Sequence, residues 1–136
     1  MTLVVDTCVL LDVALADTTH GISSAAILER YLNKGLTICP VTFIELAPQF
    51  GGNLSELREF LSICGVDPNA DWLNTDTLRC AQIFTDYVHL KRKNMSTKRP
   101  IADTMIGSFA SRFAGLITRN QKDFQPYFPK LKLILK

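Results

Sequence analysis

At 136 residues the chain has the length of one domain, enough to bury a hydrophobic core without crosslinks. A hydrophobic content of 47% excludes broad disorder, and a net charge of +2 is too small to indicate nucleic-acid binding by itself. We therefore expect a single domain over residues 1–136, in which nucleic-acid binding depends on local clusters of basic residues.

Short apolar runs predict strands at residues 2–5, 36–39 and 116–118, and alternation near residues 131–135 predicts a terminal edge strand. Apolar residues at helical spacing predict helices at residues 8–15, 22–33, 42–47, 53–64, 75–93 and 101–114. Short strands that alternate with helices indicate a three-layer α/β/α domain with a mostly parallel central sheet.

Local signals define three further details of this prediction. Gly115 is expected to end the helix that begins at residue 101, and residues 65–71 read as a turn-rich connection. The long helix at residues 75–93 is expected to bury one apolar stripe. That stripe contains Leu78, Ala81, Phe84 and Val88.

The cysteines are far apart, form no C-x-x-C pair and are expected to behave as small apolar residues. They are Cys8, Cys39, Cys64 and Cys80. With only His20 and His89 to complement them, a structural zinc site is not expected. No secretory signal or membrane-spanning run is recognisable, so we expect a cytoplasmic protein with no membrane partner.

Asp6 directly follows the first predicted strand, where ligands gather in open α/β sheets. Its alternative role is to cap the helix that follows, but a carboxylate at the end of a buried strand favours function. Asp12 and Asp17 read as solvated acids, although Asp12 is also a candidate for a supporting role near Asp6.

Each of the other candidate acids has a structural explanation when it is taken singly. Glu45 lies among apolar neighbours near the core, but with Thr42 it also matches a capping box. Asp103 can complement a helix N-terminus, and Asp123 lies in a turn that Asn120 can cap. These readings remain open for the residues one by one.

Taken together, the acids point to a metal. If Asp6 and Thr118 end neighbouring strands, Asp6, Asp103 and Asp123 converge on one cleft, and Glu45 enters it from another helix. Close carboxylates need a compensating charge, and oxygen ligands favour Mg²⁺ or Mn²⁺. Such a metal activates water and clamps a phosphodiester, and no other nucleophile motif is recognisable in the sequence.

Basic residues cluster beside these acids and are weak candidates for binding RNA phosphates. They are Lys91, Arg92, Lys93, Lys98, Arg99, Arg119 and Lys122. The alternative is that the first three of them only complement a helix C-terminus.

Four segments of the chain resemble the motifs of PIN-domain ribonucleases, in particular the VapC-type toxins of toxin–antitoxin pairs. These segments are Val4-Val-Asp-Thr-Cys-Val-Leu-Leu11, Thr42-Phe-Ile-Glu-Leu46, Ile101-Ala-Asp-Thr-Met-Ile-Gly107 and Leu116-Ile-Thr-Arg-Asn-Gln-Lys-Asp-Phe124. Cys8 stands where the family often has asparagine, and Gly107-Ser108 replaces a commoner pair of small apolar residues.

The resemblance implies a PIN-like fold and Mg²⁺- or Mn²⁺-dependent endonucleolytic cleavage of RNA, leaving 5′-phosphate and 3′-hydroxyl ends. It implies catalytic and metal-binding roles for the four acids, with polar support from Thr7, Thr118 and Asn120. It also implies a homodimer and a cognate antitoxin whose peptide covers the active-site groove. The alternatives are a non-catalytic RNA- or partner-binding module, or a phosphatase of the haloacid dehalogenase type with Asp6 as nucleophile.

Overall fold

The computed structural model describes residues 1–93 and 101–134, without the side chains of residues 91–93. Within this part of the chain, five parallel strands form one sheet in the order β3-β2-β1-β4-β5. They are β1 (Leu3–Val5), β2 (Leu36–Thr37), β3 (Val66–Asp67), β4 (Gly115–Ile117) and β5 (Leu133–Ile134). Because β1 is central, its carboxyl end is flanked by those of β2 and β4.

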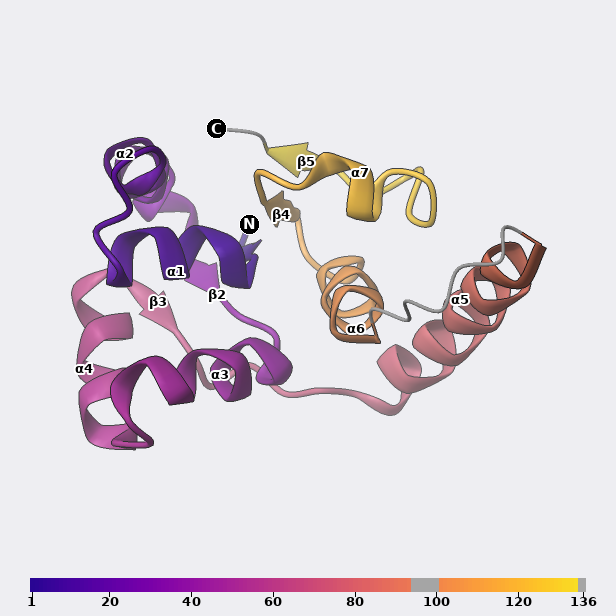
Figure 1. The fold of residues 1–136 in the computed structure, drawn as a ribbon, viewed down its shortest axis with the longest axis horizontal. Coiled ribbons are helices and arrows are strands. Elements are labelled where there is room, and N and C mark those ends of the chain that lie inside the picture. The colour runs from indigo at the N-terminus through magenta and orange to yellow at the C-terminus, as the bar shows by residue number, and fades with distance from the viewer. Residues whose placement is uncertain (94–100, 135–136) are drawn as a thin grey trace.

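Helices cover both faces of this sheet, with α1 to α4 on one side and α5, α6 and α7 on the other (Figure 1). The helices are α1 (Thr7–Ala14), α2 (Gly21–Arg30), α3 (Pro40–Leu46), α4 (Leu54–Ile63), α5 (Asn74–Lys93), α6 (Ile101–Ala110) and α7 (Gln121–Phe124). Two 3-10 turns, η1 (Leu32–Lys34) and η2 (Ala47–Phe50), follow α2 and α3. The prediction of a three-layer α/β/α arrangement is confirmed.

Alternation along the central strands divides the interior into two hydrophobic cores. Val5 and Ile117 belong to the core beneath α1, α2 and α4, whereas Val4 and Leu116 belong to the core beneath α6 and α7. All four side chains are fully buried. Successive residues of a strand point to opposite faces, so an uninterrupted apolar run is the pattern that a sheet covered on both faces requires.

Three boundaries differ from those expected. Residues 66–67 form β3 within the segment that reads as a connection, and α6 ends at Ala110, well before Gly115. Gly115 instead opens β4, where a Cβ atom would lie 2.9 Å from the carbonyl oxygen of Lys132. Glycine is therefore needed there for close strand packing rather than for helix termination. The terminal edge strand is confirmed as β5.

The buried face of α5 also differs from the expected stripe. Leu78 is 63% exposed and Ala81 is exposed, whereas Asp76, Cys80 and Tyr87 are buried. Asp76 is buried because Arg112, in the turn after α6, pairs with its carboxylate at 2.8 Å. Apolar spacing alone does not predict this face, because the face includes an acid whose partner comes from a distant segment.

Two expectations drawn from composition can be compared with this fold. All the cysteines are free; Cys39 and Cys80 are buried, and Cys8 and Cys64 are half-buried. In the residues that the structure describes, no helix is both long and apolar enough to cross a membrane.

Candidate active site

Asp6 lies at the carboxyl end of the central strand, directly before helix α1. It occupies the N-cap position of α1 and makes no side-chain cap hydrogen bond, although Thr7 and Cys8 at the start of α1 donate to its carboxylate. The carboxylate is 3% exposed, and its Oδ2 accepts hydrogen bonds from Thr118 Oγ1 at 2.7 Å and Cys8 Sγ at 3.3 Å. Helix capping therefore does not account for this residue.

Thr118 connects Asp6 to the neighbouring strand. β1 and β4 pair in register up to Val5 and Ile117, and the Asp6 amide donates to the Ile117 carbonyl at 2.9 Å. Thr118 is fully buried, and its hydroxyl oxygen also accepts a hydrogen bond from the Asn120 amide at 3.0 Å. Strand pairing therefore brings Asp6, Thr118 and Asn120 together, although more than one hundred residues separate Asp6 from the other two in sequence.

Burial raises the pKa of Asp6 above its ordinary value, and the charge of Glu45 raises it further. The hydrogen bonds from Thr118 and Cys8 act in the opposite direction but do not cancel the effect of burial. Burial also raises the pKa of the Cys8 thiol to about 12, so this group remains a protonated donor at neutral pH. A buried carboxylate with a perturbed pKa at a strand end is typical of a functional position.

Glu45 is held near Asp6 by Thr7, the first residue of α1. Thr7 Oγ1 donates to Glu45 Oε1 at 2.7 Å, and the Thr42 hydroxyl lies 3.0 Å from Thr7 Oγ1. Glu45 itself is exposed rather than close to the core, which corrects the expectation from its apolar neighbours. The exposed residue can present its second carboxylate oxygen to a ligand.

The capping box expected from Thr42 and Glu45 does not form. Helix α3 begins at Pro40, two residues earlier than expected, and Cys39 at the N-cap position makes no side-chain cap bond. Proline suits the first turn of a helix because its φ is fixed and its missing N–H has no partner there. The glutamate is therefore not occupied by the helix terminus.

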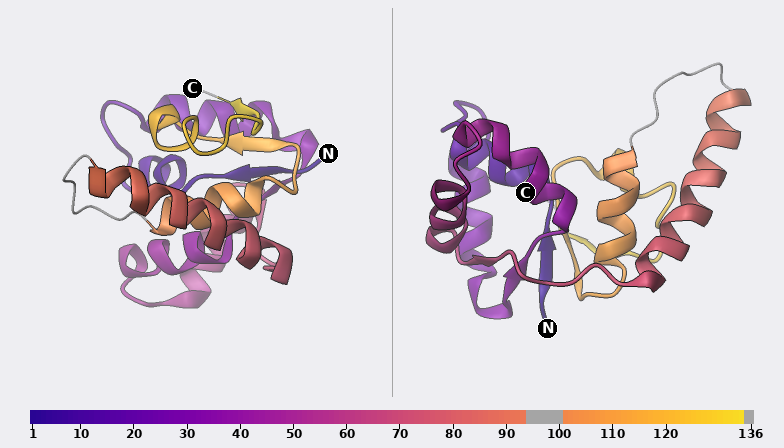
Figure 2. Two further views of the ribbon diagram at one scale, coloured as in Figure 1. Left: turned by 90° about the vertical axis from the view of Figure 1, so that its right-hand side faces the viewer. Right: turned by 90° about the horizontal axis from the view of Figure 1, so that it is seen from below.

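Asp103 and Asp123 lie in the first turns of α6 and α7. In the right-hand view of Figure 2, α6 begins at the end of the molecule toward which β1 runs, so Asp103 lies at the same end as Asp6. Both carboxylates act electrostatically on the buried phenol of Tyr87 in α5 and raise its pKa, after burial and Tyr127. No local pattern in the sequence indicates that Tyr87 lies within electrostatic range of these acids.

The acids thus lie at one end of the sheet but not all in direct contact. Asp6 and Glu45 belong to one hydrogen-bonded cluster with Thr7 and Thr118, while Asp103 is half-buried and Asp123 is exposed. Among the described residues, no three acidic, histidine or cysteine side chains are arranged as a ready metal site. The available donors are oxygens, which suit a hard cation such as Mg²⁺ or Mn²⁺.

The basic residues named in the sequence fall into three groups. The guanidinium of Arg119 is bound to Asp12, with Nε at 2.9 Å from Oδ2 and Nη2 at 3.0 Å from Oδ1. Lys122 is exposed beside Asp123. The remaining candidates lie outside the described residues or side chains: Lys91, Arg92, Lys93, Lys98 and Arg99.

Asp12 is not a solvated acid as expected. It is 3% exposed, and besides Arg119 it accepts a hydrogen bond from Ser24 Oγ at 2.7 Å. Helical spacing alone does not reveal this burial, because the partner Arg119 comes from the far end of the chain. Asp17 is half-buried and accepts hydrogen bonds from the amides of Thr19 and His20, as expected of a loop acid.

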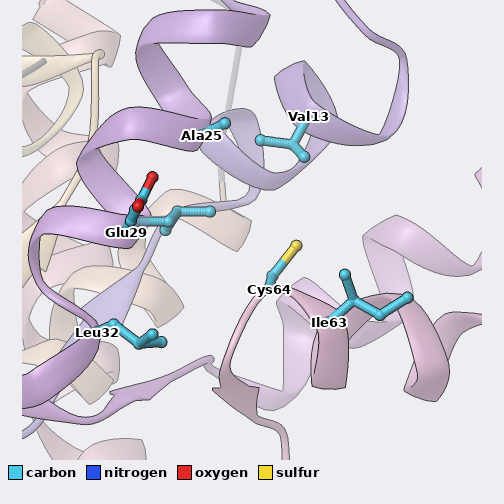
Figure 3. A pocket seen from close by; sticks show the side chains of 7 residues that line it. Val13, Ala25, Glu29, Leu32, Ile63 and Cys64 are labelled. Carbon is cyan, nitrogen blue, oxygen red and sulfur yellow. The ribbon is translucent and has the colours of Figure 1, made fainter.

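An apolar cavity of about 330 Å³ opens between α1, α2 and the end of α4, away from the acids. In Figure 3 the Cys64 thiol points toward the space between Val13 on α1 and helix α2. The carboxylate of Glu29 is the one charged group among its lining residues. Asp6, Glu45, Asp103 and Asp123 do not line this cavity, so it is not part of the candidate site.

No family model matches the chain, and a search of curated proteins finds no match either. The chemical groups that define the candidate site are therefore the acids themselves. Asp6 follows β1, Glu45 lies near the end of α3, Asp103 lies at the start of α6 and Asp123 lies in α7 after β4, so each contributes carboxylate oxygens near this end of the sheet.

Proposed function

We propose that this protein is a metal-dependent endoribonuclease that hydrolyses RNA phosphodiester bonds with Mg²⁺ or Mn²⁺. The observation that carries this proposal is the buried carboxylate of Asp6 at the end of the central strand, hydrogen-bonded by Thr118 and Cys8. A buried acid whose pKa is raised by desolvation is a candidate functional group, because a bound cation would compensate the charge of its ionised form.

The four acids have distinct roles in this proposal. Asp6, Asp103 and Asp123 would hold the metal, and Glu45 would complete its ligand set or orient the attacking water. The bound metal would activate water and stabilise the charge that develops on the phosphate. Thr118 donates to the Asp6 carboxylate, and Thr7 donates to one carboxylate oxygen of the exposed Glu45. Such outer hydrogen bonds orient metal ligands.

Attraction of the RNA backbone would come from cations around the acids. Lys122 is exposed and directly precedes Asp123 in α7, and the sequence has further lysines and arginines among residues 91–99. Phosphate contacts of this kind give affinity without sequence preference.

The assignment as a VapC-type toxin with a PIN-like fold, a homodimeric state and a cognate antitoxin rests on the motif resemblance described above. Its test is expression in a bacterial host with and without the adjacent gene of the source genome. Growth arrest relieved by the neighbour supports a toxin–antitoxin pair, and growth unaffected by the chain on its own contradicts it.

The direct test of the enzyme is incubation of the purified protein with total RNA in Mn²⁺, Mg²⁺ or a chelator, followed by mapping of the RNA ends. We expect new 5′-phosphate and 3′-hydroxyl ends in either metal and none in the chelator. RNA that is bound but never cut would instead support a non-catalytic binding module.

A further inference from the structure

We propose that Asp12 and Arg119 form a positioning pair that holds the Asp123-bearing turn against the strand end that carries Asp6. This inference rests on the proposed function, and it reassigns Arg119 from phosphate binding to organisation of the site. Neither residue is expected to touch the metal or the RNA.

The first observation is the geometry of the pair. Both carboxylate oxygens of Asp12 accept from the guanidinium, at 2.9 and 3.0 Å, and Oδ2 also accepts from Ser24. Asp12 is 3% exposed and Ser24 is fully buried, so α1, α2 and the segment after β4 meet at one carboxylate. A bidentate pair of this kind fixes orientation as well as distance.

The second observation is the location of Arg119 in the chain. It lies between Thr118, which donates to Asp6, and Asn120, whose amide donates back to Thr118. Helix α7 and Asp123 follow directly. The segment is therefore held on one side by the Thr118 side chain and on the other by the Arg119 side chain.

The third observation is that both contacts are made to the same helix. Asp6 precedes α1, and Asp12 lies six residues further on, about 9 Å along the helix axis. Two attachments that far apart prevent the segment from pivoting about Thr118. The position of Asp123 relative to Asp6 is thereby fixed.

The variant Asp12→Asn distinguishes a positioning role of Arg119 from a role in phosphate binding. If Arg119 were a phosphate ligand, Asp12→Asn would free its guanidinium and leave RNA cleavage intact, while Arg119→Gln would weaken RNA binding. If the two residues act as a positioning pair, both variants weaken Mn²⁺ binding and slow RNA cleavage to a similar degree. The double variant then loses little more than either single variant.

The chain offers a matched control in Asp76 and Arg112. This pair is also bidentate, with both contacts at 2.8 Å, and joins a buried acid to a partly exposed arginine. Arg112 lies just before β4 begins, so the control pair is at the opposite end of that strand from the acids. Arg112→Gln should therefore disturb folding without changing the site.

The experiment measures Mn²⁺ affinity by titration calorimetry, the rate of RNA cleavage, and amide hydrogen exchange of residues 118–124, all well below the unfolding temperature. We expect Asp12→Asn and Arg119→Gln to weaken Mn²⁺ binding and slow cleavage about 10- to 100-fold, as loss of outer-shell partners does. Exchange in residues 118–124 should accelerate in both variants, and Arg112→Gln should change none of the three properties.

The inference is overturned if exchange in residues 118–124 is unchanged in both variants, or if Arg112→Gln weakens Mn²⁺ binding as much as Arg119→Gln. If the wild-type protein neither binds Mn²⁺ nor cuts RNA, the proposed function fails instead. The exchange measurement still decides in that case whether the pair holds the turn.

Discussion

At the scale of single residues, Asp6 bears an energetic cost that the fold alone does not explain. Asp6 is almost completely buried, and its carboxylate accepts hydrogen bonds from Thr118, Cys8 and the Thr7 amide, but no cation pairs with it among the contacts that the structure describes. Burial consequently raises its pKa. Residues that weaken the fold in this way are characteristic of functional sites, where stability is given up for activity.

The first prediction is that Asp6→Asn raises the free energy of unfolding of the metal-free protein at pH 7. The pKa of Asp6 is raised above its ordinary value of 3.8, so the wild-type fold loses stability as pH rises through the folded-state pKa. The gain from asparagine should therefore shrink as pH falls and vanish below the unfolded-state value. Chemical denaturation at a series of pH values measures it.

Glu59→Gln is the control for this measurement, because Glu59 is exposed on α4, away from the site. It should leave stability nearly unchanged at every pH. An Asp6→Asn protein that is less stable than wild type at pH 7 would show that the buried charge is better compensated than its surroundings indicate.

The second prediction concerns Thr118, whose hydroxyl serves both Asp6 and the Asn120 amide. Thr118→Val keeps the shape but removes both bonds, which should lower the free energy of unfolding by about 1–3 kcal/mol. Thr118→Ser retains the hydroxyl and should recover most of the loss. A larger loss in Thr118→Ser than in Thr118→Val would mean that the methyl group, not the hydroxyl, contributes the stability.

At the scale of elements, the position of α6 is set by a small residue. A Cβ atom on Gly107 would lie 2.3 Å from the ring of Phe128, which is itself 6% exposed. The chain after α7 can therefore pack directly onto α6. Since α6 begins with the turn that bears Asp103 and α7 bears Asp123, this contact helps to set the spacing of the two acids.

The third prediction is that Gly107→Ala destabilises the protein by about 1–3 kcal/mol, although alanine is the better helix former. The added methyl group must displace a buried aromatic ring. Thermal unfolding measures the loss, and Gly107→Ala combined with Phe128→Leu should recover part of it. A Gly107→Ala protein more stable than wild type would place the ring elsewhere.

At the scale of the whole molecule, the three layers could be predicted because the residues that define each strand and helix are close together in sequence. Apolar runs such as Leu3 to Val5 define buried strands, and an acid directly after such a strand must lie at its carboxyl end. The three-layer fold and the position of Asp6 follow from those two rules.

Contacts between distant segments could not be predicted in the same way. The pairing of Asp12 with Arg119 and the place of Tyr87 beside Asp103 and Asp123 join parts of the chain far apart in sequence. Such contacts produce no periodic pattern in the sequence. Strand β3 could not be predicted for a related reason. Its two residues are too few to show an alternating pattern, and only their pairing with β2 defines the strand.

The central claim is that the acids at the carboxyl end of the sheet form one metal-dependent nuclease site. Its most direct test is the rate of RNA cleavage in Mn²⁺ by wild type, Asp6→Asn, Asp103→Asn and the control Glu59→Gln, each checked for folding. We expect both aspartate variants to lose at least about 100-fold in rate and Glu59→Gln to match wild type. Folded Asp6→Asn and Asp103→Asn proteins that cut RNA as fast as wild type would contradict the claim.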